Sequence, residues 1–423
     1  MVRRFKDPSM KFLYNIGIRS YGLSIAIASL FNDKAKRWRR GRKDIFTKLQ
    51  AVFENVKEPV AWFHCSSLGE FEQGRPVMEA FRQKFPSYKI LLTFFSPSGY
   101  DVRRDYIGAD YVFYLPLDTP SNAKQFVKLV KPKFTVFVKY EFWYNYLNQL
   151  HKANVPTYLI SAKFRQDQYF FKGYGSWFRK QLKVYKKIFV QDTDSEELLK
   201  SIKVDDVVVA GDTRFDRVIA IAEQVKLDKL VRAFKGNSRL WVCGSTWPED
   251  EKMILHAFYH LKVSGENVKL LLVPHEIGDN NINRILNMFP KAVKYSAAKE
   301  AEVLKTDVLV VDKMGLLSSL YSNGDIAYVG GGFGKGIHNL PEAAVYGIPV
   351  LFGINYHKFN EACELIKCNG GSSISSADEM LSDVSHLLKD EAFRKKSGEA
   401  AKAYIYGARG ATEKIIAELS SIS

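Results

Sequence analysis

Runs of apolar residues alternate with amphipathic segments from about residue 60 onward. The first seven apolar runs cover residues 60–67, 89–96, 111–117, 134–140, 156–162, 187–192 and 207–212. Segments with helical periodicity lie between them, such as 70–85 and 121–131. Near-continuous hydrophobic runs are typical of parallel strands whose sheet is covered by helices on both faces. The pattern therefore predicts a βαβ series.

A second series of the same kind follows a charged helical connection. Its apolar runs cover residues 239–245, 268–274, 308–312, 325–331 and 348–353. We expect an α/β fold with two doubly wound, Rossmann-like domains, because 423 residues exceed one ordinary domain. The expected boundaries are a basic apolar segment at 1–43, a first domain at 44–216, a linker at 217–237, a second domain at 238–410 and a closing helix at 411–423. Ligands of such paired domains usually bind in the cleft where the carboxyl ends of both sheets meet.

The net charge of +16 is concentrated at the amino terminus. Residues 1–43 contain twelve Lys or Arg and two Asp, beside an apolar stretch at 12–31 that Arg19 interrupts. The uncharged part, 20–32, is short for a membrane span. We expect an interfacial helix with the basic residues of 34–43 on anionic lipid headgroups, which would place the next domain on the cytoplasmic side. A single span with a snorkelling Arg19 is the main alternative. A nucleic-acid-binding arm is disfavoured because no nucleic-acid motif accompanies the segment.

The cysteines give no sign of a disulfide scaffold or a zinc site. The four cysteines, at positions 65, 243, 363 and 368, show neither pattern of spacing. A reducing cytoplasm suits this usage. No cluster of metal ligands is evident, and we expect neither a metal nor a cofactor.

Glu70 stands at the carboxyl end of the first apolar run, just after two serines and a glycine. An acidic residue suits the first turn of a helix, which is a structural interpretation. A ligand-facing group at the end of a parallel strand is a functional interpretation. The position alone leaves both open.

A glycine-rich stretch follows the apolar run at 325–331. Its glycines at 330–332, 334 and 336 would let backbone N–H groups approach a phosphate, although the spacing fits neither a Walker loop nor GxGxxG. Glu342, on the first turn of the next helix, could accept hydrogen bonds from both hydroxyls of a ribose. Alone, such a glutamate is more often a partner of the helix dipole, but together with the glycine-rich stretch the ribose interpretation is favoured.

Two further strand ends carry polar residues. Ser245 and Thr246 precede a helix that starts at Pro248, so they suit a phosphate or carboxylate, although a helix N-cap explains them nearly as well. His275 leaves an apolar run in "LLLVPHEI" at the expected cleft, although a lone histidine is more often structural.

Eight motifs in order resemble the 3-deoxy-D-manno-octulosonic acid (Kdo) transferases of lipopolysaccharide synthesis. After the basic apolar amino terminus, the resemblance rests on "HCSSLGE", "TFFSPSGYD", "KYEFWYN", "SAKFR", "GDTRFD", "GSTWPEDE" and "HNLPEAAVYGIPVLFG". It covers almost the whole chain. It implies a two-domain glycosyltransferase of the GT-B type that inverts the anomeric centre without a metal. It also implies CMP-Kdo as donor, a lipid A precursor (lipid IVA) as acceptor, and a place on the cytoplasmic face of the inner membrane of a Gram-negative bacterium.

The resemblance also assigns expected roles to residues. Glu70 would be the general base that takes the proton from the acceptor hydroxyl. Ser98, Gly99 and Glu141 would bind the acceptor. The donor would be held by Ser245, Thr246, His275, Gly331, Gly332, Lys335, His338, Asn339 and Glu342.

Three departures from the family pattern affect these roles. His275 stands where the family often has an arginine, and Lys139 replaces an acidic residue. Lys335 replaces a histidine–glycine run and would supply the missing positive charge, so Lys335→Met should weaken donor binding. The alternatives are a membrane-associated GT-B enzyme with a UDP-sugar donor, which UDP rather than CMP would inhibit, and a non-catalytic adaptor, which would be indifferent to Glu70→Ala.

Overall fold

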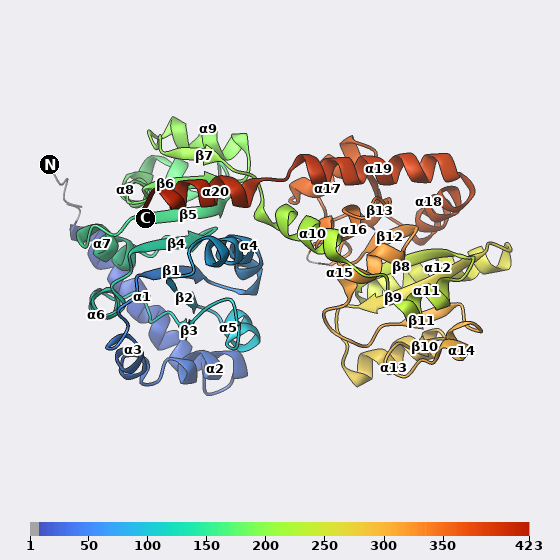
Figure 1. The fold of residues 1–423 in the computed structure, drawn as a ribbon, viewed down its shortest axis with the longest axis horizontal. Coiled ribbons are helices and arrows are strands. Elements are labelled where there is room, and N and C mark those ends of the chain that lie inside the picture. The colour runs from blue at the N-terminus through green and yellow to red at the C-terminus, as the bar shows by residue number, and fades with distance from the viewer. Residues whose placement is uncertain (1–7, 335, 423) are drawn as a thin grey trace. The chain divides into compact units, whose positions relative to one another are not determined.

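The computed structural model describes residues 8–334 and 336–422 and divides the chain into two compact units (Figure 1). The first unit comprises Met1–Asp216 and Gly410–Ser423, and the second comprises Arg217–Arg409. Each unit contains one seven-stranded sheet in which all neighbouring strands run parallel. The predicted fold class, two doubly wound α/β domains, is confirmed.

The sheet of the first unit has the order β3-β2-β1-β4-β5-β6-β7. Every strand of this sheet was predicted from an apolar run, because parallel strands are buried on both faces. The strands are β1 Val60–Cys65, β2 Lys89–Phe94, β3 Tyr111–Tyr114, β4 Phe134–Val138, β5 Thr157–Ala162, β6 Lys187–Val190 and β7 Val207–Val209.

Alternate side chains of each strand enter two different cores. Trp62 of β1 packs with α3, α6 and α7, whereas Phe63 packs on the opposite face with α4 and α20. The helices of this unit are α1 Pro8–Ala28, α2 Asp33–Gly41, α3 Ile45–Phe53, α4 Leu68–Lys84, α5 Pro97–Arg103, α6 Pro120–Val130, α7 Tyr144–Lys152, α8 Ser176–Leu182, α9 Thr193–Ser201 and α20 Ala411–Leu419, with 3₁₀ turns at Tyr169–Phe171, Gly173–Gly175 and Ser420–Ile422.

Helix α1 docks on the first unit through a buried carboxylate. Asp118 is 1% exposed and accepts hydrogen bonds from the Tyr14 hydroxyl at 2.6 Å and from the backbone N–H groups of Asn145 and Tyr146. Burial raises the pKa of Asp118 to about 6. One side of the predicted amino-terminal segment therefore packs partly buried against the first unit, while several of its large apolar side chains remain exposed, among them Phe12, Leu23 and Phe31.

Helix α20 returns to the first unit, although it lies about 200 residues beyond the rest of it. Its Ala411, Ile415 and Leu419 are buried in the core that includes α4. Asp216, at the other boundary of the unit, accepts hydrogen bonds from the N–H groups of Gly410 and Thr412. These bonds hold the point where the chain leaves the first unit beside the point where it returns.

The sheet of the second unit has the order β10-β11-β9-β8-β12-β13-β14. Its strands are β8 Arg239–Thr246, β9 Val268–Pro274, β10 Val293–Lys294, β11 Val308–Val310, β12 Ile326–Val329, β13 Val350–Gly353 and β14 Gly371–Ile374. Helices α12, α13 and α18 pack into one core on this sheet. The helices from residue 213 to 407 are α10 Thr213–Gln224, α11 Lys229–Lys235, α12 Pro248–Val263, α13 Asp279–Met288, α14 Glu300–Val303, α15 Leu317–Leu320, α16 Pro341–Ala344, α17 Asn360–Lys367, α18 Ala377–Lys389 and α19 Glu391–Gly407, with a 3₁₀ turn at Tyr321–Asn323.

Each sheet has a central point where the strand order reverses and the chain crosses to the other half of the sheet. In the first unit the reversal lies between β1 and β4, and in the second between β8 and β12. Open α/β sheets bind ligands outside the carboxyl ends of the strands at such a point. Glu141 and Gly331 lie in the loops after β4 and β12, Glu70 lies in the first turn of the helix after β1, and Ser245 lies in the last residues of β8.

Candidate active site

Glu70 lies in the first turn of α4, directly after β1 at the reversal point of the first sheet. Its side chain is half-buried, and the hydroxyl of Ser67 donates a hydrogen bond to its Oε2. The positive end of the helix favours a negative charge at this position. A carboxylate in this setting has the hydrogen-bonding capacity of a general base and is accessible to a substrate.

Glu141 follows β4, the strand beside β1, and is only 2% exposed. The indole Nε1–H of Trp143 donates to its Oε2, and His64 Nε2 lies 3.2 Å from the same oxygen. Lys139, two residues earlier, has a φ of +73°, which is a costly conformation for a residue with a side chain. Backbone strain of this kind clusters at functional sites.

The other two predicted acceptor residues begin α5, after β2. Ser98 is exposed and its Oγ lies 3.0 Å from Ser96 Oγ. Gly99 is buried, and a Cβ there would lie 2.3 Å from the ring of Phe94. Packing therefore accounts for Gly99, while Ser98 is accessible. The backbone N–H of Ser96 donates to Ser66 O at 2.7 Å, which joins this loop to the one that precedes Glu70.

Asp250 organises the reversal point of the second sheet. It is 1% exposed, and its Oδ2 accepts hydrogen bonds from the backbone N–H groups of Trp247 at 2.8 Å and Gly331 at 3.0 Å. Its Oδ1 accepts a hydrogen bond from the Tyr328 hydroxyl at 2.6 Å. One carboxylate thus connects the loop after β8 to the glycine turn after β12.

Three aromatic rings lie together beside the glycine turn. Trp247 Nε1–H donates to His338 Nε2 at 2.9 Å, and these two rings are nearly coplanar, with an interplanar angle of 11°. His275 stacks over both, with ring centroids 4.6 Å from Trp247 and 4.4 Å from His338. Because the indole can only donate, His338 Nε2 must be unprotonated. Burial and the neighbouring His275 lower the pKa of His338 to about 4, so the ring is neutral near pH 7.

The remaining predicted donor residues have different surroundings. Ser245 is half-buried with a φ of +53°, whereas Thr246 is buried and its hydroxyl donates to Glu251 at 3.1 Å. Gly332 has its backbone against Gly353, where a Cβ would lie 2.5 Å from a main-chain atom. Asn339 Nδ2 donates to Glu342 Oε1 at 2.7 Å. Lys335 lies outside the described residues.

The structure thus groups His275 and His338 around Trp247 beside Gly331, places the backbone O of Ser245 next to Gly330, and joins Asn339 to Glu342. Sequence reasoning missed Trp247 and Asp250, which link the members of that group. An acidic residue three positions after a helix cap is a recognisable capping pattern, and it would have identified the bond from Trp247 N–H. The bonds from Tyr328 and Gly331 join residues about 80 positions apart, so no local pattern reveals them.

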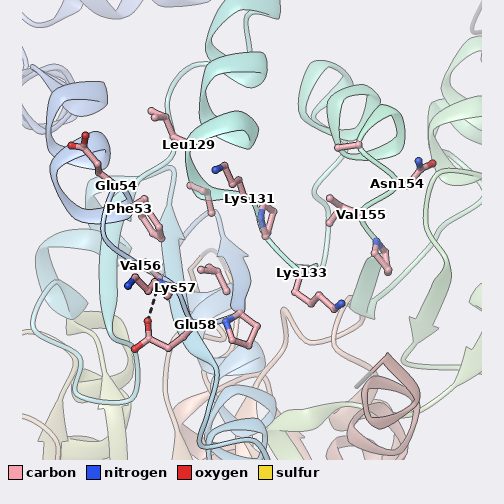
Figure 2. A pocket seen from close by; sticks show the side chains of 16 residues that line it. Phe53, Glu54, Val56, Lys57, Glu58, Leu129, Lys131, Lys133, Asn154 and Val155 are labelled. Carbon is pink, nitrogen blue, oxygen red and sulfur yellow. Dashed lines mark hydrogen bonds between the residues drawn. The ribbon is translucent and has the colours of Figure 1, made fainter.

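A cavity of about 670 Å³ lies on the opposite edge of the first sheet (Figure 2). It is lined by residues that precede β1, β4 and β5, including Lys57, Lys131 and Lys133. It therefore opens at the amino ends of the strands, far from the edge where α/β sheets bind ligands. Its lysines are ordinary surface residues, and we assign it no role in the chemistry.

In residues 8–334 and 336–422, no three His, Cys, Asp or Glu side chains gather as ligands for a metal. No helix in the same part of the chain combines the length and apolarity needed to cross a membrane.

Known proteins share both the fold and the sequence pattern. A UDP-GlcNAc 2-epimerase from Neisseria meningitidis superposes with a TM-score of 0.60 at 16% identity, over 86% of this chain and 99% of that one. A glycosyltransferase from Rickettsia africae ESF-5 superposes with a TM-score of 0.57 at 13% identity, over 87% and 99% of the two chains. At these identities the superpositions show the fold alone. With two Rossmann-like units, this fold is the GT-B type.

The sequence comparison identifies the family. The family model described as 3-Deoxy-D-manno-octulosonic-acid transferase (kdotransferase) matches residues 36–217. The 3-deoxy-D-manno-octulosonic acid transferase of Aquifex aeolicus is 31% identical over 357 residues, which cover 81% of this chain and 91% of that protein. The chain therefore belongs to the 3-deoxy-D-manno-octulosonic acid transferase family and is a glycosyltransferase, as the resemblance implied.

Proposed function

We propose that the protein transfers Kdo from CMP-Kdo to a lipid A precursor such as lipid IVA, with inversion and with Glu70 as general base. The observation that carries this proposal is the position of Glu70, a half-buried carboxylate on a helix start at the reversal point of the first sheet. Membership of the family supports Kdo as the transferred sugar, and the position of Glu70 supports its role as the general base.

In the proposed reaction, Glu70 removes the proton from an acceptor hydroxyl. The oxygen then attacks the anomeric carbon of Kdo, the bond from that carbon to the CMP phosphate breaks, and CMP departs with the bonding electrons. A single displacement of this kind inverts the anomeric centre. Correct positioning of the two substrates supplies much of the remaining rate enhancement.

The donor would be held by the second unit. The N–H of Gly331 is already bonded to Asp250 and those of Gly334 and Gly336 to Gly331 O, so the proposed phosphate donor at this turn is the neutral His338, which can donate from Nδ1. Ser245, His275 and the Asn339–Glu342 pair complete the proposed donor site, with Lys335 as an additional cation. The acceptor would be held by the first unit at Glu141 and Ser98.

The amino-terminal helices suit a lipid-linked acceptor at the inner membrane surface. A pocket of about 560 Å³ in the first unit is lined by Arg19, Trp38 and Arg39 together with apolar residues of α1 and α3. Arginines beside an apolar surface fit the phosphates of a lipid A precursor.

The exposed apolar side chains of α1 and the basic α2 would rest on anionic lipid at the cytoplasmic face. Sedimentation of the protein with phosphatidylglycerol vesicles, but not with phosphatidylcholine vesicles, tests this contact; equal sedimentation with both would refute it.

The decisive experiment is incubation with CMP-Kdo and lipid IVA, followed by mass spectrometry of the product. One or two mass steps of Kdo support the proposal, and CMP rather than UDP should inhibit.

Glu70→Gln should lower kcat by about 10²–10⁴-fold, the range for loss of a general base. Glu79→Gln is the matched control, because Glu79 lies on the same helix but pairs with Arg75. Full activity of Glu70→Gln would exclude the proposed base, and inhibition by UDP alone would exclude the proposed donor.

A further inference from the structure

His64 is a wholly buried histidine in the middle of the first unit. It lies near the carboxyl end of β1 and is 0% exposed, among apolar residues of the sheet. A buried polar ring lowers stability unless its nitrogen atoms have partners, so an apolar residue would serve packing better here. The partners of His64 therefore indicate its purpose.

On one side, His64 Nδ1 contacts Thr93 of the neighbouring strand β2. The Thr93 hydroxyl lies 2.8 Å from Nδ1 and also accepts a hydrogen bond from Trp62 Nε1–H at 2.8 Å. Its own hydrogen can then go to Nδ1, or to Phe63 O at the longer distance of 3.4 Å. Nδ1 also lies 3.1 Å from the backbone O of Thr93, which can only accept, so Nδ1 either accepts from the Thr93 hydroxyl or, in a protonated ring, donates to this carbonyl oxygen.

On the other side, His64 Nε2 faces the carboxylate of Glu141. The two atoms are 3.2 Å apart, within ion-pair distance, but they do not have the geometry of a hydrogen bond. If Nε2 carried a lone pair, two acceptors would face each other without water between them, which is costly in the core. A protonated ring would also keep a hydrogen on Nε2. In both forms His64 therefore presents positive charge density to Glu141.

Thr93 and His64 together restrain one side of the Glu141 carboxylate. Both His64 and Trp143 reach Oε2 of Glu141. For Oε1, the described part of the chain shows no hydrogen-bond donor, and the side chain as a whole is 3% exposed. One oxygen is thus fixed in place, and the other keeps its capacity to accept.

From this geometry we infer that His64 is a positioning residue for Kdo transfer, aimed by the Thr93 hydroxyl, which orients the Glu141 carboxylate so that Oε1 can accept a hydrogen bond from the acceptor sugar. The inference rests on the proposed acceptor role of Glu141. It adds the requirement that the orientation of Glu141, rather than its charge alone, supports the reaction.

The first test varies Thr93, because its effect on Glu141 is indirect. Thr93→Val should lower kcat about 10-fold, and Thr93→Ser, which keeps the hydroxyl, should restore most of it. Thr135→Val is the matched control: Thr135 lies on β4 opposite Trp62 and is equally buried, but its hydroxyl has no hydrogen-bond partner among the described residues. That variant should retain wild-type kcat.

The second test varies His64 in combination with Glu141. His64→Leu should lower kcat about 100-fold and leave the KM for CMP-Kdo within about 2-fold, whereas His64→Gln should retain kcat within about 5-fold, since its amide can donate from the position of Nε2. In a Glu141→Gln background, His64→Leu should add less than about 3-fold. Thermal unfolding of each variant establishes that it is folded; if His64→Leu does not fold, the Thr93 and Thr135 variants decide.

The outcomes separate this inference from the proposed function. Equal losses in Thr93→Val and Thr135→Val, or independent effects of His64→Leu and Glu141→Gln, would show a structural role only and overturn the inference. Full activity of Glu141→Gln would refute the proposed role of Glu141 itself. Loss in Glu141→Gln with wild-type kcat in His64→Leu would leave that role intact and refute the positioning by His64.

Discussion

Each sheet has a buried carboxylate at its reversal point, after β4 in the first unit and after β8 in the second, and the two carboxylates have different partners. Glu141, at the reversal point of the first sheet, is held by the side chains of His64 and Trp143. Asp250, at the reversal point of the second, is held by two backbone N–H groups and the Tyr328 hydroxyl. Both are nearly inaccessible to solvent, at 2% and 1% exposure.

The difference shows what each carboxylate contributes. A carboxylate that binds backbone N–H groups determines the shape of a turn, and Asp250 fixes the glycine turn in this way. A carboxylate that is bound by side chains is itself the group being oriented. We therefore expect substitutions at Asp250 to affect stability and donor binding, and substitutions at Glu141 to affect turnover with less effect on stability.

Asp250→Asn should give the largest loss of stability. An asparagine has one acceptor oxygen where the aspartate has two, so at least one buried donor loses its partner. We expect the free energy of unfolding to fall by about 2–4 kcal/mol and the KM for CMP-Kdo to rise more than about 10-fold. Urea denaturation and steady-state kinetics measure both.

The controls for Asp250→Asn lie on the same helix and in the other unit. Glu249→Gln changes the exposed neighbouring carboxylate and should have little effect. Glu141→Gln should lose less than about 2 kcal/mol while kcat falls. If Asp250→Asn and Glu141→Gln lost equal stability and left the KM for CMP-Kdo equally unchanged, the two carboxylates would not have the different roles that we assign to them.

Gly331→Ala should have the next largest effect. Gly331 has a φ of +92°, and a Cβ would lie 2.6 Å from Gly336 O, so the alanine variant must distort the glycine turn. We expect a loss of about 1–3 kcal/mol and a higher KM for the donor. Gly334→Ala, for which the nearest atom to the added Cβ is 3.7 Å away, should be tolerated. Equal behaviour of the two variants in donor titrations would contradict the assigned geometry.

The smallest predicted effect concerns the protonation of His338. Its pKa of about 4 in the folded protein lies below the ordinary value of 6.5, so between these pH values the unfolded chain binds more protons. The stability contributed by the neutral ring is therefore complete above pH 6.5 and is lost as the pH falls toward 4. In His338→Gln, whose amide oxygen can still accept from Trp247, the free energy of unfolding should fall less over this range. Equal pH dependence of the two proteins would show that the ring titrates normally.

The sequence predicted the strands well because burial on both faces leaves continuous apolar runs. The exceptions were β10 and β14: the former has only two residues, and the latter, Gly371–Ile374, contains two serines where an apolar run would be expected. The contacts of the candidate site residues were harder to predict from the sequence. Glu70 and Glu141 were found from motifs, but the positive φ of Lys139 depends on the turn into which it folds. His64 was treated as part of a strand, because its contacts with Thr93 and Glu141 join segments that only the sheet brings together.

The return of α20 to the first unit has a consequence for biosynthesis. Ile415 and Leu419 complete the core against α4, the helix that begins beside Glu70. A ribosome makes residues 217–409 before it makes this helix, so the second unit can fold while one face of the first sheet is covered only in part. The helix that carries Glu70, the proposed general base, therefore has its complete packing only after residues 411–419 have emerged. A nascent chain released before that point would expose an apolar surface to the chaperones and proteases of the cell.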